Sequence, residues 1–342
     1  MIDDTIVKLF DRSELARVML PITSVSGGFM HRMFKVDTSK GSYAVKFLNP
    51  EVMKRPDAMN NYIRAEKLER ILEAENVPIL PALTVDGNKM QEYDGRYFYI
   101  FQWLNGNTTD WNAITKKQCK QAGHIQGRIH AIQSKNIEHI PTEICAIDWI
   151  GYVKEAKKHN SIIAPILEEN IQLLEYAQDA VNTSRKALPD LECIIDEDMD
   201  PKNVMWVNDK PVVIDLECLD YGNPVSAVLQ LSLQWSGITT CNLDLDLQKA
   251  FFEGYLEAYD NGFRDYADVC GLAYTWIEWL EYNINRSLGD YQDEKELEMG
   301  IAEVKNTVKR LRYIREHECA IRHNLEHLFD WSEDYEKLKE GK

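Results

Sequence analysis

The sequence lacks the paired cysteines of a zinc site or a disulfide framework. Its seven cysteines are odd in number, lie scattered along the chain and never form a Cys-x-x-Cys pair. This pattern is typical of free thiols in a reducing compartment. The first residues also lack the basic and then apolar layout of a signal peptide, and no apolar run approaches the length of a membrane span. We therefore expect a cytoplasmic protein without a structural zinc site.

Basic residues are too few to balance the acidic ones. The 342 residues include 39 Lys and Arg against 56 Asp and Glu, which gives a net charge of -17 at pH 7. Such an excess of carboxylates repels nucleic acids and anionic membrane surfaces, and it attracts cations. The charge therefore argues against nucleic-acid and membrane partners and fits a cationic small molecule, although an acidic surface also serves solubility alone. Nothing in the sequence indicates an oligomeric state.

Internal repeats, low-complexity tracts and flexible linkers are absent, yet the two parts of the chain differ. The first part combines strand patterns with one helix pattern at 58–75. Its strand patterns are 19–25, 33–37, 42–48, 89–93 and 96–103. The later part is mainly helical, with helix patterns at 116–134, 225–235, 244–259, 266–288 and 295–326. We predict an α+β fold with two lobes: a small β-rich lobe at 1–103 and a larger, mainly helical lobe at 104–342.

An acidic loop between short apolar runs is the most informative segment. Asn203 follows Asp198 by five residues, and Asp215 ends an apolar run twelve residues later. The runs are typical of short buried strands, and the last two are joined by a turn that would return Asp215 beside Asn203. Phosphoryl transfer needs a carboxylate near the acceptor hydroxyl and oxygen ligands for magnesium. These three residues could supply such groups, whereas a plain solvated turn is the alternative.

The same residues resemble the aminoglycoside phosphotransferase and choline kinase family, small-molecule kinases with the protein-kinase fold. In that family a loop His-Gly-Asp-x-x-x-x-Asn precedes a strand that ends in Ile-Asp, and this chain matches at Asp198, Asn203, Ile214 and Asp215. The resemblance implies a bilobal protein-kinase-like fold. It also implies that Asp198 is the catalytic base, that Asn203 and Asp215 bind Mg²⁺, and that ATP or GTP is the phosphoryl donor.

The loop departs from the family pattern at two positions. Asp196 stands in place of the usual histidine, and Glu197 stands in place of the glycine that follows it. Without the histidine, the packing that orients the loop must come from other residues. This departure is the support for one alternative, a catalytically silent structural or interaction protein that keeps the fold.

A glycine turn in the first lobe offers backbone groups to a nucleotide. Ser26, Gly27 and Gly28 fall between the first two strand patterns, where glycine lets backbone amides approach phosphate oxygens. The turn is neither a P-loop nor a complete Gly-x-Gly-x-x-Gly pattern. The segment 97–104 should hold the adenine through backbone hydrogen bonds at Gln102 and Leu104.

Lys46 lies in the apolar run 43–48, where a charge is costly unless it is paired. The resemblance implies that Lys46 binds the α- and β-phosphates and pairs with a glutamate of the helix at 58–75. Glu66 is the first choice for that partner, and Glu69 and Glu73 stay open because the rotation of the helix is not fixed. Ile214, just before the metal-binding aspartate, would pack under the base.

The acceptor is less well defined. The segment 274–286 combines aromatic residues with Glu278 and Glu281 and could bind an ammonium group, but a core helix with solvent-facing acids is the favoured interpretation. We predict a Mg²⁺-dependent kinase that phosphorylates a hydroxyl of a small cationic molecule, with an aminoglycoside-like antibiotic favoured. Choline, an amino acid or a sugar is the alternative acceptor. A protein kinase is disfavoured because the His-Arg-Asp, Asp-Phe-Gly and Ala-Pro-Glu motifs are absent.

Overall fold

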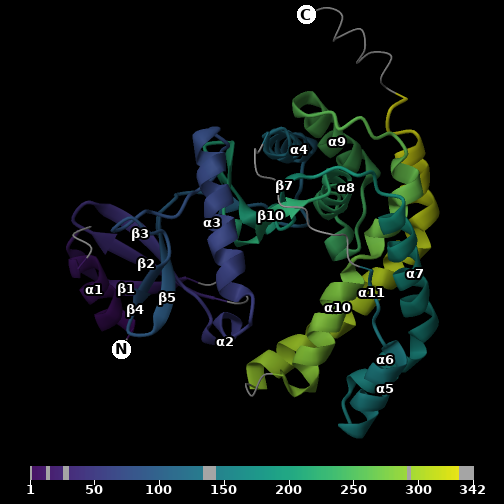
Figure 1. Ribbon diagram of the computed structural model, residues 1–342, viewed down its shortest axis with the longest axis horizontal. Helices are drawn as coiled ribbons and strands as arrows, with labels where there is room; N and C mark the ends of the chain where they lie inside the picture. The colour runs from purple at the N-terminus through teal and green to yellow at the C-terminus, as the bar shows by residue number, and fades with distance from the viewer. Residues whose placement is uncertain (1, 13–15, 26–30, 134–143, 291–293, 331–342) are drawn as a thin grey trace, which may run out of the picture. The chain divides into compact units, whose positions relative to one another are not determined.

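The computed structural model describes residues 2–12, 16–25, 31–133, 144–290 and 294–330 (Figure 1). The chain forms two compact units. The first consists of Met1–Thr109 and Lys202–Asp220, and the second of Asp110–Pro201 and Tyr221–Lys342. A segment from the middle of the chain thus packs with the N-terminal unit. The division of the chain at residues 103 and 104 stays a prediction.

The first unit is built on an antiparallel sheet of five strands in the order β1-β2-β3-β5-β4. The strands are β1 (Val18–Val25), β2 (Arg32–Thr38), β3 (Gly41–Phe47), β4 (Gln91–Tyr93) and β5 (Arg96–Gln102). In β3, Lys46 lies opposite Met33 of β2 and Tyr99 of β5. A smaller sheet joins β6 (Asn107–Thr108), β8 (Val204–Val207) and β9 (Lys210–Val213).

Helices complete the first unit. The sequence analysis did not predict α1 (Ile2–Arg12), which packs Ile6 and Phe10 into the apolar core of the sheet. The helix expected at 58–75 is α3 (Ala58–Ala74), preceded by the short α2 (Pro50–Met53). Buried side chains recur along α3 at Tyr62, Ala65, Leu68 and Leu72, so that one face of the helix is covered.

The second unit is mainly helical, as predicted. Its helices are α4 (Lys116–His130), α5 (Trp149–Lys158), α6 (Ile163–Glu169), α7 (Ile171–Lys186), α8 (Pro224–Trp235), α9 (Leu245–Ala258), α10 (Trp276–Asn285) and α11 (Glu294–Glu326). Glycines let α4 and α9 pack closely, because a Cβ at Gly123 or Gly254 would collide with backbone of the other helix. The helix expected at 266–288 is instead interrupted: a 3₁₀ segment (Tyr266–Tyr274) precedes α10, and a π turn (Arg286–Asp290) follows it.

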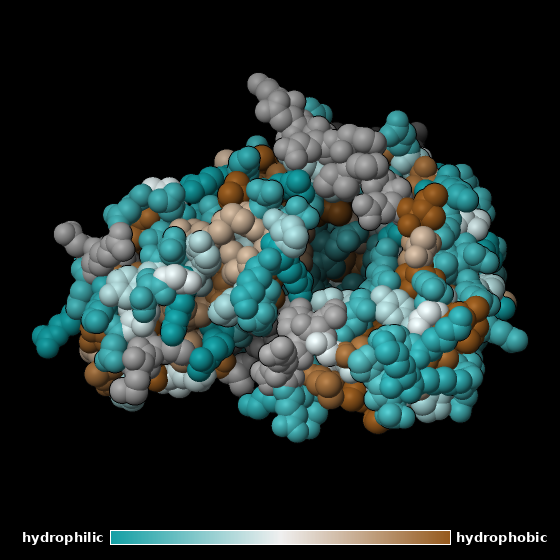
Figure 2. Space-filling view, turned by 60° about the horizontal axis from the view of Figure 1, so that its bottom comes forward, coloured by the Kyte–Doolittle hydropathy of each residue, from teal (hydrophilic) through white to brown (hydrophobic). Residues whose placement is uncertain are grey.

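Two short strands flank these helices in sequence: β7 (Cys193–Asp196) leads into the acidic loop, and β10 (Leu219–Gly222) follows the second metal-ligand candidate. Hydrophilic residues dominate the face drawn in Figure 2, in keeping with the high content of charged side chains. Among the helices of the described ranges, none has both the length and the apolar character needed to cross a membrane.

Candidate active site

A tight hairpin places Asp215 at the end of β9. Strands β8 and β9 pair antiparallel, with Val204 opposite Val213, and the turn between them carries Asn208 and Asp209 in the left-handed region. Beyond the paired strands, the amide of Ile214 donates to the carbonyl of Asn203 at 2.8 Å. The hairpin expected from the sequence is therefore present, and it holds the backbone of the two metal-ligand candidates side by side.

The backbone of Asp215 is itself unusual. Its φ of 61° and ψ of 60° lie in the left-handed region, which asparagine and aspartate tolerate better than other non-glycine residues. The preceding strand is fixed on its other side, because Val213 exchanges backbone hydrogen bonds with Pro78 and Leu80 at 2.8 Å each. Residues held in this conformation cluster at functional sites. The geometry turns the chain so that the Asp215 carboxylate faces Lys46.

Lys46 is a buried cation held by two carboxylates. Its Nζ lies 2.6 Å from Asp215 Oδ1 and 2.8 Å from Glu217 Oε1, and its side chain is 6% exposed. Burial opposes the charge of Lys46, but the two carboxylates outweigh burial and raise the pKa of this lysine above its ordinary value. Lys46 therefore stays protonated, as a group that binds phosphate must.

The structure differs from the expectation that Lys46 pairs with a glutamate of α3. Glu66 instead accepts from the amide of Met90 at 2.9 Å and from the hydroxyl of Tyr99 at 3.1 Å. Glu69 and Glu73 both pair with Lys89, whose side chain is 1% exposed. The glutamates of this helix thus have other partners among the described residues. Two of these glutamates bind Lys89, for which the sequence predicted only a place in a strand.

Glu217 takes the place expected for the helix glutamate. Its second oxygen, Oε2, lies 3.1 Å from His31 Nε2. The amide of Asn49 donates to His31 Nδ1 at 3.0 Å, so the imidazole proton resides on Nε2 and is donated to Glu217. Burial opposes ionisation of Glu217, but Lys46 and His31 hold the pKa of its carboxyl below the usual range. Glu217 therefore bridges a cation and an imidazole.

Glu217 and His31 were not among the site residues predicted from the sequence. The available signal for Glu217 was its position two residues after Asp215. His31 carried no such signal, because its contact spans 186 positions and depends on the fold. Together with Tyr62 and Glu66, the segment 215–217 lines a small pocket against α3 and β5.

The loop that carries Asp198 is held by hydrogen bonds within the second unit. The Asp196 side chain, 2% exposed, accepts from the amide of Asp198 at 3.1 Å. One residue further, Trp235 Nε1 donates to the carbonyl of Met199 at 2.9 Å. Such a side-chain cap of the backbone two residues on is a common way to fix a turn. Asp196 therefore supplies part of the support that this loop needs in the absence of the usual histidine.

The other predicted residues fall as follows. Gln102 ends β5, where its side chain donates to the carbonyl of Ser42 at 3.0 Å, and the half-buried Leu104 follows two residues later. Ile214 is half-buried after β9. Ser26, Gly27 and Gly28 lie outside the described residues. Asp198 belongs to the second unit, whereas Lys46, Asn203 and Asp215 belong to the first, so their convergence on one metal ion stays a prediction.

The acids of α10 are paired within the second unit. Glu278 binds Arg185 at 2.8 Å, and Glu281 accepts from the hydroxyl of Tyr152 at 3.0 Å. Buried Ile277 and Leu280 on the same helix fit the interpretation of a core helix with acids on its outer side. His130, near the end of α4, is also a structural residue: it contacts the hydroxyl of Tyr255 at 2.9 Å, and burial lowers its pKa to about 3.

Comparison with known proteins bears on the family and the fold of the chain. The sequence profile described as "phosphotransferase enzyme family" matches residues 21–267. A search of curated proteins finds no match. Among solved structures, a spectinomycin phosphotransferase bound to ADP and spectinomycin has a TM-score of 0.68 at 15% identity, over 90% of this chain and 97% of that chain.

Two further solved structures are also similar to this chain. A choline/ethanolamine kinase family protein from Mesorhizobium loti has a TM-score of 0.64 at 13% identity, over 95% of this chain and 99% of that chain. The choline kinase LicA from Streptococcus pneumoniae has a TM-score of 0.56 at 16% identity, over 91% and 99% of the two chains. These likenesses show a kinase-like fold, with an N-terminal antiparallel sheet followed by a largely helical region, and confirm the predicted fold class.

Proposed function

The chain belongs to the phosphotransferase enzyme family and is a small-molecule kinase, and from this premise we propose that it uses Mg²⁺ to transfer the γ-phosphoryl group of ATP or GTP to a hydroxyl of a small cationic molecule. The observation that carries the proposal is the buried contact of Lys46 with Asp215 and Glu217. It joins a phosphate-binding cation from β3 to the acids after β9. The spectinomycin phosphotransferase bound to ADP and a similar structure, an amicoumacin kinase bound to AMP-PNP, support a nucleotide as donor.

The residues at the two ends of the β8–β9 hairpin fit a magnesium ion. Asn203 and Asp215 offer oxygen ligands, which Mg²⁺ prefers, and the left-handed backbone of Asp215 fixes its carboxylate beside Lys46. When bound, magnesium would neutralise charge on the phosphates. Lys46 would then exchange part of its contact with Asp215 for phosphate oxygens, while Glu217 keeps it in place.

We assign Asp198 the role of base. Its carboxylate would orient the acceptor hydroxyl and take its proton, while Lys46 stabilises the negative charge on the transferred group. Ser26, Gly27 and Gly28 would face the phosphates, and Gln102, Leu104 and Ile214 would hold the adenine. Glu66 has no direct role in holding Lys46 in this proposal, because its carboxylate already binds Met90 and Tyr99.

The test of this function is a screen for nucleotide-dependent phosphorylation of aminoglycosides, choline, amino acids and sugars, read by mass spectrometry. Asp198→Ala should lower turnover by about 10²- to 10⁴-fold and leave nucleotide binding intact. Glu197→Gln, which changes an exposed acid of the same loop, serves as the control. Turnover that survives in Asp198→Ala would remove Asp198 from this role.

The candidate acceptors fall into two main classes, antibiotics and amino alcohols. The net charge of -17 favours a cation, and we favour an aminoglycoside-like antibiotic, which would make the protein a resistance enzyme. The amicoumacin kinase and the spectinomycin phosphotransferase among the similar structures support an antibiotic, whereas LicA and an ethanolamine kinase support an amino alcohol. Phosphorylation of choline but of no antibiotic would decide for the amino alcohol.

A catalytically silent protein is the second candidate. The hydrogen bond from the Asp198 amide to Asp196 weighs against it, because this bond supports the loop in place of the usual histidine. Asp196→Ala should lower kcat by about fivefold, since losing such a cap costs about 1 kcal/mol, and should leave nucleotide affinity unchanged. Asp196→Asn keeps the accepting oxygen and is the matched control. Absence of nucleotide hydrolysis with every acceptor would favour the silent candidate.

A further inference from the structure

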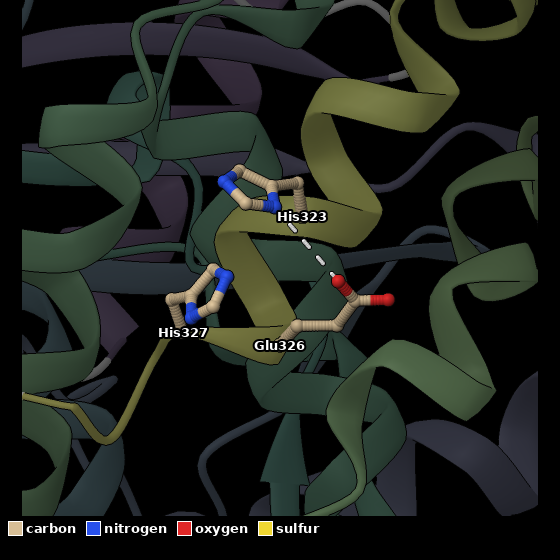
Figure 3. A group of neighbouring side chains, drawn as sticks. All are labelled: His323, Glu326 and His327. Atoms are coloured by element: carbon tan, nitrogen blue, oxygen red, sulfur yellow. Dashed lines mark ion pairs between the residues drawn. The ribbon is translucent and has the colours of Figure 1, made fainter.

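A cluster of metal-ligating side chains lies at the C-terminal end of α11, in the second unit. The side chains of His323 and Glu326, at the end of this helix, and of His327, the first residue after it, point toward one another, and one potential ligand atom of each lies within 4.8 Å of the others (Figure 3). The amide of His327 still donates to the carbonyl of His323 at 3.3 Å, so the helical spacing continues to this residue. We propose that these three residues bind a divalent transition-metal ion, with Zn²⁺ as the reference. The proposal is independent of the kinase activity and involves none of its residues.

The spacing of the three residues suits one ion. Residues three and four positions apart lie on the same face of a helix, and a histidine pair at this spacing is a known zinc-binding arrangement. The two imidazole rings have centroids 4.4 Å apart, and His323 Nδ1 lies 3.8 Å from Glu326 Oε2. Side-chain rotation alone can bring such atoms to zinc-ligand distances of about 2.0 to 2.2 Å.

Asp330 supplies the supporting carboxylate that metal-binding histidines commonly have. Its Oδ2 lies 2.6 Å from His327 Nδ1. This contact keeps the imidazole proton on Nδ1 and leaves the lone pair of Nε2 for an ion. Figure 3 shows a ring nitrogen of His327 facing the side where His323 and Glu326 lie. The carboxylate therefore selects the tautomer that can bind a metal.

Charge and donor type favour a transition metal at this position. The segment 323–330 contains two acids and no lysine or arginine, and the C-terminal end of a helix attracts cations. Imidazole nitrogen suits zinc, copper and nickel, whereas magnesium prefers oxygen. The cluster should therefore not compete for the ion that the proposed kinase centre uses.

Exposure allows an ion to reach the cluster without any opening of the fold. The side chains of His323, Glu326 and His327 are 72%, 49% and 52% exposed. Three protein ligands leave a fourth position for water or for a group from another molecule. Because the residues stand on the surface, at the end of one helix and in the turn that follows it, we assign the site a binding role and no reaction.

The experiment is calorimetric titration of the untagged full-length protein with ZnCl₂, in excess MgCl₂ so that oxygen-rich sites are filled. We expect one site, with affinity reduced at least tenfold in His323→Ala and in His327→Ala. Asp330→Asn should weaken it by about tenfold, the lower end of the effect of losing a supporting carboxylate. All three positions are exposed, so the variants should fold, which far-UV circular dichroism checks.

Two controls separate this site from incidental zinc binding. His159→Ala removes an exposed histidine that also lies beside a glutamate, at 2.8 Å from Glu155, but has no histidine four residues away; it should change nothing. Cys319→Ser removes an exposed thiol four residues before His323. Zinc binding that is equal in wild type and both histidine variants, or that is lost only with Cys319, overturns the proposal. With Cu²⁺ as probe, electron paramagnetic resonance should show two bound imidazole nitrogens, and one would likewise overturn it.

Discussion

Two buried lysines in the first unit have the same kind of surroundings and different consequences. Lys46 binds Asp215 and Glu217, and Lys89 binds Glu69 and Glu73. The side chains of the two lysines are 6% and 1% exposed. Burial with two carboxylates is therefore not by itself a sign of function. What separates the pairs is the backbone that carries the acids.

The acids around Lys89 stand on the regular helix α3, whereas those around Lys46 stand on an irregular turn with a left-handed residue. Their titration differs as well. Burial raises the pKa of Glu69 in spite of Lys89, whereas Lys46 and His31 outweigh burial and lower the pKa of Glu217. Both pairs include a partly open carboxylate, Asp215 at 37% and Glu73 at 39% exposed, but only around Lys46 does it lie beside a buried acid whose negative charge is stabilised. We propose that this arrangement serves a nucleotide and its metal.

Replacement of Lys46 should have the largest effect on activity. We expect Lys46→Met to lower turnover by about 10²- to 10³-fold, since one preorganised charge for the transition state is lost. Stability should fall less than in the matching change at Lys89, because Glu217 is 19% exposed and keeps its contact with His31, whereas Glu69 is only 8% exposed. Initial-rate kinetics and urea unfolding measure the two quantities. Near-normal turnover would place Lys46 with Lys89 as a structural residue.

The matching change at Lys89 should lower stability strongly and turnover little. Lys89→Met leaves Glu69 buried without its cation, and we expect a loss of about 3 kcal/mol in the free energy of unfolding. Turnover per folded molecule should remain near that of the wild type, measured well below the unfolding midpoint. A large loss of turnover in fully folded Lys89→Met would erase the contrast between the two lysines.

The contrast also marks what the sequence can predict. The hairpin before Asp215 follows from local chemistry, because the turn residues Asn208 and Asp209 tolerate left-handed backbone between two apolar runs. The partner of Lys46 does not follow from local chemistry, because Glu217 is 171 positions away and the rotation of α3 is set by packing. The alternative glutamates Glu66, Glu69 and Glu73 share one helix, and local periodicity could not show which residues each of them would bind.

Glu217→Gln sharpens the assignment of the lysine partner. Loss of this charge should raise KM for the nucleotide by about tenfold, in line with roughly 1.4 kcal/mol for a charged hydrogen bond, and change kcat less. Glu66→Gln is the comparison, and its effect should be smaller because Glu66 contacts Met90 and Tyr99 rather than Lys46. The reverse order of the two effects would restore the helix glutamate as the partner.

The smallest effect is expected at Glu73, the outermost member of the second pair. Its side chain is 39% exposed, against 8% for Glu69, so water screens its attraction to Lys89. Glu73→Gln should therefore cost less than about 1 kcal/mol of unfolding free energy, the scale of exposed ion pairs, and should leave turnover unchanged. Urea unfolding at low and high salt measures this, and raising the salt should narrow the difference from wild type. A loss as large as that of Lys89→Met would mean that the carboxylate of Glu73, rather than that of Glu69, holds the buried lysine.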